Sequence, residues 1–266
     1  MKCLTSDDAE ISYHVLGDGP PVVLLHPFPA HHEFWLPAAQ ALSSRYRLVL
    51  PDLRAHGESG GGQGAATMAK HAADLARICD HEAIGRAVFA GVSIGGYIIF
   101  EYWRRYRGRV AGLVLCDTRA QADTPEGRSA RLQSATDVLE RGTEPFVDNL
   151  LPRLLGKTTQ ATRPDLVVAA RKMALKMSPE DISLVQKGMA ERPDSVPTLK
   201  TINVAALVLA GEEDILTPVA DAELMRQKLP DAQLKVVPRG GHFAAFEQPE
   251  AVGGILRQFL DTLHGA

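Results

Sequence analysis

The sequence contains little cysteine, no long apolar run and no excess of charge of one sign. Its three cysteines, Cys3, Cys79 and Cys116, are scattered and lack the spacing of metal ligands, which favours reduced thiols in a cytoplasmic protein. No stretch approaches the roughly 18 to 20 apolar residues of a membrane span, and residues 1–8 turn acidic where a signal peptide would need an apolar core. We therefore expect a cytoplasmic protein with no membrane partner.

The distribution of charge gives no indication of a nucleic-acid partner. The chain has 29 basic and 32 acidic residues, a formal net charge of -3, and no long block of one sign. No metal-ligand pattern and no nucleotide-binding loop is visible, so neither a metal nor a cofactor is expected. With 266 residues, 45% of them hydrophobic, the chain can bury one large core or one core with an inserted subdomain. The sequence leaves the oligomeric state open.

The most informative feature that is present is the segment Gly91-Val92-Ser93-Ile94-Gly95. An apolar run leads into this segment, and a helix-compatible stretch follows it directly. Turning from strand to helix in so few residues strains the backbone at the central position and leaves no room for side chains two residues away on either side. This context predicts a nucleophile elbow with the serine hydroxyl at its apex, whereas the pattern alone would indicate only a flexible turn.

Apolar runs and helical stretches alternate along most of the chain. The runs are short, rich in Val and Leu, and mostly continuous, as in strands that are buried on both faces of a sheet. Strands are expected at residues 2–4, 10–15, 22–26, 46–51, 87–91, 112–116, 205–210 and 234–237, and helices at residues 34–43, 67–82, 97–106, 219–229 and 249–263. Alternating strands and helices predict an α/β fold with a mostly parallel sheet.

The alternation stops in the interval 120–198. Four apolar stripes at helical spacing occupy it, with helix start signals at Thr124 and Ser178. Four helices inserted there would cover the carboxyl ends of the strands, where open α/β sheets hold their sites. We therefore expect a core of residues 1–119 and 199–266 and a helical cap of residues 120–198.

A serine nucleophile needs a base within hydrogen-bond reach. Among the nine histidines, His242 follows the last strand on a glycine-rich loop at the carboxyl edge of the sheet, where the base is expected in this kind of sheet. His31, His32 and His56 lie in loops near the same edge and are its rivals. His26 ends a strand and is expected to form structural hydrogen bonds.

Two residues compete for the role of the acid that orients this base, because Asp117 and Asp214 each follow a strand in the same half of the sheet. Asp214 is favoured, because the strand that it follows is the one immediately before the strand that leads to His242, and these two strands should lie side by side. Glu213 is expected to be solvated. Asp52 is expected to hold the loop after the fourth strand through side-chain hydrogen bonds.

The oxyanion of a tetrahedral intermediate requires N–H donors. One should be the backbone N–H of Ile94, at the amino end of the helix that follows the elbow. The second should come from the turn after the third strand. Pro27 and Pro29 have no N–H in that turn, which leaves the amide of Phe28 as the donor.

Taken together, these motifs resemble those of the α/β-hydrolase superfamily over essentially the whole chain. The resemblance implies an eight-stranded, mostly parallel sheet flanked by helices, a helical cap after the sixth strand, and a triad of Ser93, Asp214 and His242. The sequence departs from the usual family pattern at Pro27 and Ala55, where glycine is usual, and neither is a triad position. The matching motifs are residues 24–29, residues 52–59, the elbow, residues 211–218 and residues 241–243.

Within the superfamily the chain is most similar to the branch of 3-oxoadipate enol-lactonase-like enzymes and small carboxylesterases, which includes cofactor-free perhydrolases. A serine at the elbow indicates acyl transfer from an ester carbonyl. A short-chain carboxylesterase acting on a small ester is therefore the first prediction, and a lactone hydrolase of the enol-lactonase type or a perhydrolase is the alternative. A receptor that reuses the pocket is the non-enzymatic alternative, which an intact Ser93, Asp214 and His242 set argues against.

The cap stripes supply Leu, Val and Met side chains, which suit an apolar acyl or alcohol group. A dianionic lactone would instead require cationic groups. Surface solvation is expected for most of the cationic residues in or near the cap, which are Arg104, Arg105, Arg119, Arg128, Arg131, Lys172 and Lys176. The predicted pocket residues are Trp35, for which core packing is the alternative, and Leu139, Phe146, Leu150, Met173 and Met177.

Overall fold

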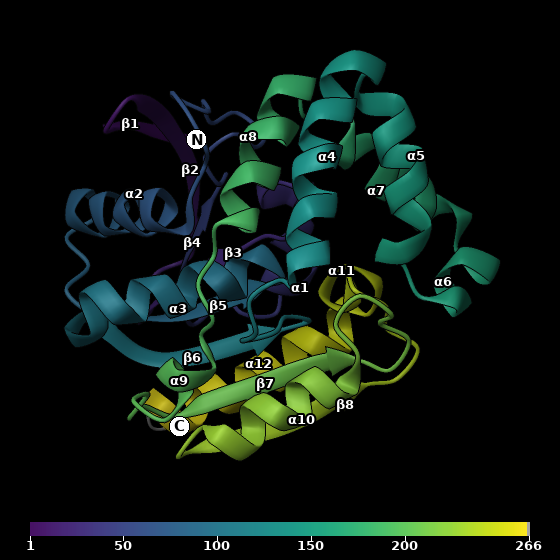
Figure 1. The fold of residues 1–266 in the computed structure, drawn as a ribbon. Helices are drawn as coiled ribbons and strands as arrows, with labels where there is room; N and C mark the ends of the chain where they lie inside the picture. The colour runs from purple at the N-terminus through teal and green to yellow at the C-terminus, as the bar shows by residue number, and fades with distance from the viewer. Residues whose placement is uncertain (265–266) are drawn as a thin grey trace.

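An eight-stranded sheet runs through the computed structural model, which describes residues 1–264 (Figure 1). Each of the expected strands is present, with ends that differ by a few residues, and the predicted α/β-hydrolase fold is confirmed. The strands are β1 (Lys2–Ser6), β2 (Ala9–Leu16), β3 (Pro21–Leu25), β4 (Arg47–Pro51), β5 (Ala87–Val92), β6 (Val110–Cys116), β7 (Ala206–Gly211) and β8 (Ala232–Val237).

The strand order places the expected functional residues at one edge of the sheet. The order is β1-β2-β4-β3-β5-β6-β7-β8, with β2 antiparallel to its neighbours β1 and β4. From β4 through β3 to β8 every neighbouring pair is parallel. Val92 at the end of β5 is aligned with Cys116 at the end of β6, and Cys116 with Leu209 in β7. Ser93, Asp117 and the residues after β7 therefore leave the sheet at the same edge.

Helices cover both faces of the sheet. α2 (Met68–His81), α3 (Ile94–Tyr106) and α10 (Val219–Lys228) pack on one face, and α1 (Leu36–Ala39), α11 (Ala244–Glu247) and α12 (Pro249–His264) pack on the other. The helix expected at residues 34–43 is instead a 3-10 turn, η1 (His32–Trp35), followed by the short α1. Pro37 lies in the first turn of α1, where a proline fits the start of a new helix. A second 3-10 turn, η2 (Arg107–Arg109), joins α3 to β6.

The segment between β6 and β7 is helical, as expected. Within this fully described interval there are six helices rather than the expected four, because two short helices carry no apolar stripe of their own. Thr124 and Ser178 cap their helices by accepting hydrogen bonds of 3.1 Å from the N–H groups of Gly127 and Asp181. The six are α4 (Pro125–Arg141), α5 (Thr143–Leu154), α6 (Lys157–Thr162), α7 (Pro164–Ala174), α8 (Pro179–Ala190) and α9 (Val196–Leu199).

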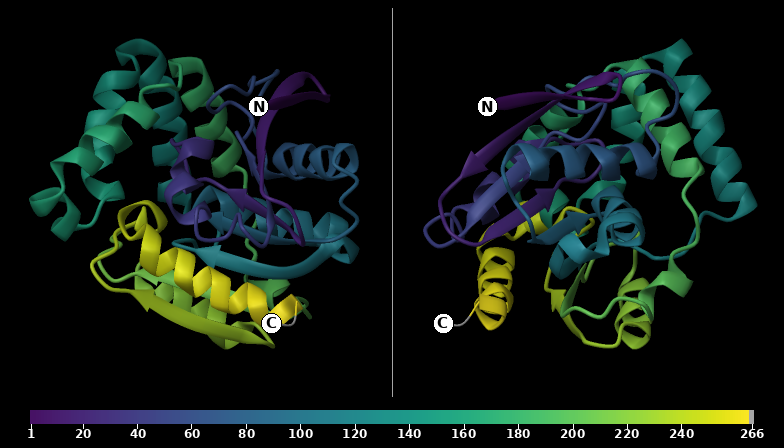
Figure 2. Two further views of the ribbon diagram at one scale, coloured as in Figure 1. Left: turned by 180° about the vertical axis from the view of Figure 1, so that it is seen from behind. Right: turned by 90° about the vertical axis from the view of Figure 1, so that its left-hand side faces the viewer.

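The longer helices of this segment stand together at one end of the molecule, at the top of Figure 1 and away from α10 and α12 (Figure 2). α4 packs along α8, and α5 packs against α7. The division into a core of residues 1–119 and 199–266 and a cap of residues 120–198 stays a prediction. Among the helices of residues 1–264, none combines the length and the apolar character needed to cross a membrane.

Candidate active site

Ser93 occupies a strained turn between β5 and α3. Its backbone has φ 54° and ψ -114°, a conformation that is rare for a residue with a side chain. A Cβ atom added at Gly91 would lie 2.5 Å from the carbonyl carbon of Gly95, and one added at Gly95 would lie 2.9 Å from the carbonyl oxygen of Leu25. Neither distance leaves room for a side chain. This confirms the prediction that the elbow has no room for a side chain two residues before or two residues after Ser93.

His242 is hydrogen-bonded to Asp214. Its Nδ1 atom lies 2.8 Å from Oδ2 of Asp214, and both side chains are buried. The other Asp214 oxygen accepts hydrogen bonds from the N–H groups of Leu216 at 2.7 Å and Thr217 at 3.0 Å, and the Thr217 hydroxyl donates to Oδ2 at 2.5 Å. Burial raises the pKa of the Asp214 carboxyl, but His242 and these donors outweigh it, so the pKa lies below its ordinary value. Asp214 is therefore a carboxylate that fixes the imidazole ring.

Asp117, the rival acid, lies in a different environment. Its Oδ1 atom accepts a 2.6 Å hydrogen bond from the N–H of Gly211, and within the described residues it has no hydrogen bond to His242. Complete burial, together with the neighbouring charge of Asp214, raises the pKa of the Asp117 carboxyl well above its ordinary value. A carboxyl that is bonded to Gly211 and makes no hydrogen bond to the imidazole in the described residues does not suit the role of the orienting acid.

Two of the other histidines lie in the core and are tied to the backbone. His26 contacts the carbonyl of Pro27 through Nδ1 at 2.9 Å and accepts a 2.9 Å hydrogen bond from the N–H of Leu53 at Nε2. The Nδ1 atom of His56 lies 2.9 Å from the carbonyl of Arg54. Burial lowers the pKa of His26 well below its ordinary value and that of His56 to about 4. The structural role expected for His26 is thus observed.

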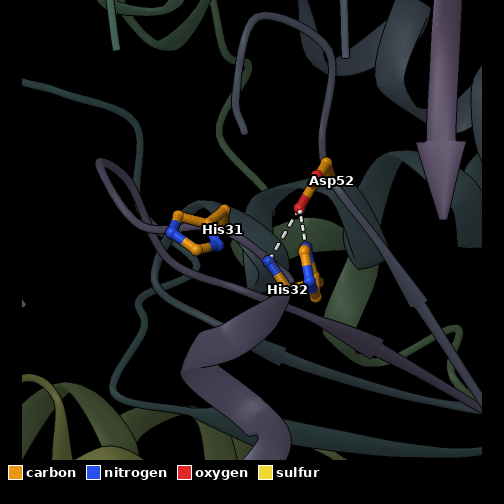
Figure 3. A group of neighbouring side chains, drawn as sticks. All are labelled: His31, His32 and Asp52. Carbon is orange, nitrogen blue, oxygen red and sulfur yellow. Dashed lines mark hydrogen bonds and ion pairs between the residues drawn. The ribbon is translucent and has the colours of Figure 1, made fainter. Parts of the chain in front are cut away.

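His31 and His32 gather around Asp52 (Figure 3). Asp52 Oδ1 accepts hydrogen bonds of 2.8 Å from both the backbone N–H and the Nδ1 of His32, and Oδ2 accepts one of 2.9 Å from the N–H of Glu58. Two histidines and a carboxylate are also a ligand set that divalent metals use. Here, however, both carboxylate oxygens already accept hydrogen bonds. The cluster therefore holds the loop after β4, as expected for Asp52.

Ser93 and His242 line one cavity of about 420 Å³, whose other lining residues include side chains of α4, α5 and α8. Within residues 1–264 no hydrogen bond joins the two side chains, and such bonds are often long in sites without a bound ligand. Phe28 lines the cavity from the turn after β3, with its ring centroid 5.8 Å from that of Phe146 on α5. The remaining walls come from Tyr97, Arg119, Asp123, Gly127, Ala130, Arg131, Ser134, Asn149, Leu150, Arg153, Leu154, Gln186, Met189, Arg192, Ile215, Leu216 and Thr217.

The predicted donors of the oxyanion hole are the backbone N–H groups of Phe28, in the turn after β3, and Ile94, directly after Ser93. Phe28 precedes Pro29 through a cis peptide bond, and Ile94 is the first residue of α3. In the part of the chain that the structure describes, neither backbone N–H has a hydrogen-bond acceptor. Phe28 itself lines the cavity, whereas Ile94 is buried directly after Ser93.

Only two of the six predicted pocket residues, Phe146 and Leu150, line the cavity. The prediction is wrong for Trp35, which is fully buried against Phe34 in the core, and for Leu139, which is 48% exposed on the outer side of α4. It is also wrong for the two methionines: Met173 packs in the same core cluster as Trp35, and Met177 in the cluster around α2 and α3. Helical spacing predicts which residues share a face, but not what that face contacts.

The cavity has more positive charge than the sequence suggested. Arg119 and Arg131, which were expected to be solvated, line it, as do Arg153 and Arg192. No feature of the sequence indicated that Arg153 and Arg192 lie at the cavity, because residue spacing does not show where the end of a long side chain lies. Arg104 and Arg105 instead pair with Glu101. The other cationic residues considered, Arg128, Lys172 and Lys176, are not among those that line the cavity.

Glu213 is not simply solvated, contrary to expectation. Its carboxylate accepts hydrogen bonds from the Thr158 N–H at 2.8 Å and the Thr158 hydroxyl at 2.6 Å. Glu213 immediately precedes Asp214, and Thr158 lies in α6. This contact therefore ties α6 to the loop that carries Asp214.

Comparison with known proteins places this geometry in a family. Residues 20–249 match the model of the alpha/beta hydrolase fold, and the chain belongs to that family. An esterase from Thermogutta terrifontis, solved with malate bound, is 38% identical with a TM-score of 0.94, covering 96% of this chain and 94% of the esterase. The pimeloyl-[acyl-carrier protein] methyl ester esterase of Nitrosomonas europaea is 29% identical over 91% of this chain and 96% of its own. The 3-oxoadipate enol-lactonase 2 of Acinetobacter baylyi is 24% identical over 96% of each chain.

Proposed function

We propose that this protein is a serine hydrolase that cleaves carboxylic esters of small molecules through an acyl-enzyme. The observation that carries the proposal is the pair formed by Asp214 and His242, 2.8 Å apart, in a site whose cavity also contains Ser93 at a strained elbow. The likeness to the T. terrifontis esterase, at 38% identity over nearly the whole of both chains, supports the same reaction.

The first half of the reaction follows from the positions of these groups. Ser93 Oγ attacks the ester carbonyl carbon and gives its proton to Nε2 of His242, while Asp214 stabilises the imidazolium from the Nδ1 side. The N–H groups of Phe28 and Ile94 donate to the oxyanion. His242 then returns its proton to the alcohol oxygen as the carbon–oxygen bond breaks, which leaves the acyl group on Ser93.

The second half repeats these steps with water. His242 takes a proton from a water molecule that attacks the acyl carbonyl, and the tetrahedral intermediate collapses to the carboxylic acid and free Ser93. A lactone is a cyclic ester and is cleaved by the same steps, so hydrolysis of a lactone is the second candidate, which the name of the A. baylyi relative favours.

The test is hydrolysis of 4-nitrophenyl butyrate by the wild type and by Ser93→Ala and His242→Ala. Each substitution should lower turnover by several orders of magnitude, because members of a triad act as a unit. Circular dichroism checks that both variants fold. More than a tenth of wild-type turnover in folded Ser93→Ala would contradict the proposal, and would leave a receptor on a hydrolase scaffold as the better account.

A further inference from the structure

The cavity beside Ser93 carries positive charge in a chain whose formal net charge is -3. Four arginines line it, Arg119, Arg131, Arg153 and Arg192, against one carboxylate, Asp123. The cavity charge is therefore opposite in sign to that of the chain as a whole. Such a site attracts anions, and it does so more strongly where the walls exclude water.

Three of the four arginines are already paired. Asp123 accepts hydrogen bonds from Arg192 at 2.6 and 2.7 Å and from Arg131 at 2.7 Å, so one carboxylate serves two guanidinium groups. Arg119 lies 3.2 Å from Asp221 and donates to the carbonyl of a loop residue. The Nε atoms of Arg119 and Arg192 are buried and have no acceptor in the described part of the chain. The pairing therefore leaves an excess of positive charge and of donors.

Arg153 differs from the other three, because within residues 1–264 it has neither an ion pair nor a side-chain hydrogen bond. It lies on α5, on the helix face that also presents Phe146, Asn149 and Leu150 to the cavity. Arg153 lies seven positions after Phe146, which is about 10 Å along a helix axis. One helix thus gives the cavity an aromatic wall beside Phe28 and, two turns further on, a free guanidinium.

The Arg153 end of α5 lies near the base. The carbonyl of Leu154, the next residue, accepts a 2.9 Å hydrogen bond from the N–H of Phe243, which follows His242. The cavity that contains Ser93 therefore has apolar rings where Phe28 and Phe146 meet and a cation, the exposed Arg153, further along α5. An ester seated on Ser93 with a charged group several bonds from its carbonyl fits this polarity.

We propose that the substrate is an ester that also bears a carboxylate, and that Arg153 binds this carboxylate. A guanidinium forms two parallel hydrogen bonds with a carboxylate, which gives orientation as well as affinity. Asn149, on the same face of α5, adds an amide that can donate to it. This assignment rests on the proposed ester hydrolysis, and it replaces the purely apolar acyl or alcohol group expected from the cap stripes.

The kinetic test uses two pairs of esters of matched length. In one, 4-nitrophenyl hemiglutarate is compared with its methyl ester, so that the charge lies on the acyl side. In the other, 3-carboxyphenyl butyrate is compared with its methyl ester, so that the charge lies on the alcohol side. The wild type should show at least one pair in which kcat/KM of the anion exceeds that of the neutral ester by about tenfold or more.

Arg153→Gln should lower that anion-to-neutral ratio by about 10- to 100-fold, the loss expected when a hydrogen bond to a charged group is removed. Arg141→Gln is the matched control, because Arg141 is exposed in the last turn of α4 and does not line the cavity. Its ratio should equal that of the wild type. Preference for the neutral ester in both pairs, or an unchanged ratio in Arg153→Gln, would overturn the proposal.

A binding measurement separates this proposal from the proposed reaction. Calorimetry with Ser93→Ala should detect monomethyl glutarate but not dimethyl glutarate, and adding Arg153→Gln should weaken the binding of the monoanion at least tenfold. Binding of the monoanion by an enzyme that hydrolyses no ester would contradict the proposed function and support the carboxylate site. Ester hydrolysis without selective binding of the monoanion would support the proposed function and contradict the carboxylate site.

Discussion

The Oε1 atom of Glu247 accepts a 2.9 Å hydrogen bond from the backbone N–H of Gly241, the residue before His242. Its Oε2 atom accepts one of 2.8 Å from the N–H of Gly156, in the loop between α5 and α6. One buried carboxylate therefore holds both the loop of the base and the cap segment. Together with the contact between Glu213 and Thr158, it fixes the end of α5 that carries Arg153 over the site.

Glu247→Gln should disturb this connection. A glutamine amide has one acceptor oxygen, so its NH₂ group would face one of the two N–H donors and leave that donor buried and unpaired. We expect a loss of about 1 to 3 kcal/mol in the free energy of unfolding and a lower kcat/KM, measured by urea denaturation and ester hydrolysis. Glu250→Gln, in the exposed first turn of α12, is the control. Equal stability of the two variants would show that the carboxylate is dispensable.

The choice between the two acids predicts unequal effects of matched substitutions. Asp214→Asn should lower kcat by about 10⁴-fold, because the amide favours the wrong tautomer of His242. Asp117→Asn should have a far smaller effect, since that side chain is bonded to Gly211 and, within residues 1–264, makes no hydrogen bond to His242. Steady-state kinetics of the two proteins decides the matter. The reverse order of damage would move the acid to Asp117 and leave the reaction class unchanged.

Truncation at the cavity wall should change substrate preference. Leu150→Ala enlarges the cavity beside Phe28 and Phe146, so the preferred acyl or alcohol length should increase, with one methylene contributing about 1 to 3 kcal/mol to selectivity. Leu139→Ala removes the same atoms from an exposed position on the same segment and should leave the profile unchanged. Identical profiles of kcat/KM against chain length for both variants would mean that the cap segment is only a cover.

Acid should destabilise the protein partly through Glu82. This carboxylate accepts hydrogen bonds from the Lys2 Nζ at 2.8 Å and the Tyr13 hydroxyl at 2.6 Å, and it pairs with Arg47. Burial raises the pKa of Glu82, but these partners lower it to about 2. A carboxyl whose pKa is lowered in the folded state contributes stability above its unfolded pKa and loses that contribution as the pH falls through its folded pKa.

Glu82→Gln should therefore lower the free energy of unfolding at pH 7 by about 1 to 3 kcal/mol. It should also flatten the decline of stability between about pH 4.5 and pH 2. Denaturation curves across that range measure both effects, with Glu191→Gln as the control, at an exposed position whose carboxylate has no partner within residues 1–264. A decline as steep as that of the wild type would show that other groups carry the acid sensitivity.

Local sequence rules were sufficient for the parts of the site that depend on backbone geometry. The strands, the elbow at Ser93 and the loop of His242 follow from short apolar runs and glycine spacing, because these features act over a few residues. The pairing of His242 with Asp214 rather than with Asp117 could also be predicted. The strand before Asp214 comes immediately before the strand that precedes His242 in the chain, so the two strands were expected to be neighbours in the sheet.

The walls of the cavity could not be predicted in the same way. Leu139 and Leu150 both belong to apolar stripes, yet one is exposed and the other lines the cavity, because the packing of the helices against one another decides which stripe is covered. The termini of Arg153 and Arg192 lie several bonds from their backbones. The position of Arg192 depends on Asp123, which only the folded chain brings near, and that of Arg153 depends on how α5 packs over the cavity.

The central claim is that Ser93 carries the acyl group during turnover, and trapping of that adduct tests it most directly. The wild-type protein is mixed with 4-nitrophenyl butyrate, quenched in acid within milliseconds, digested and analysed by mass spectrometry. The account predicts a butyryl group on the peptide that contains Ser93, and no adduct there in Ser93→Ala or after turnover is complete. A butyryl group on another residue, or full turnover with no adduct at any quench time, would contradict it.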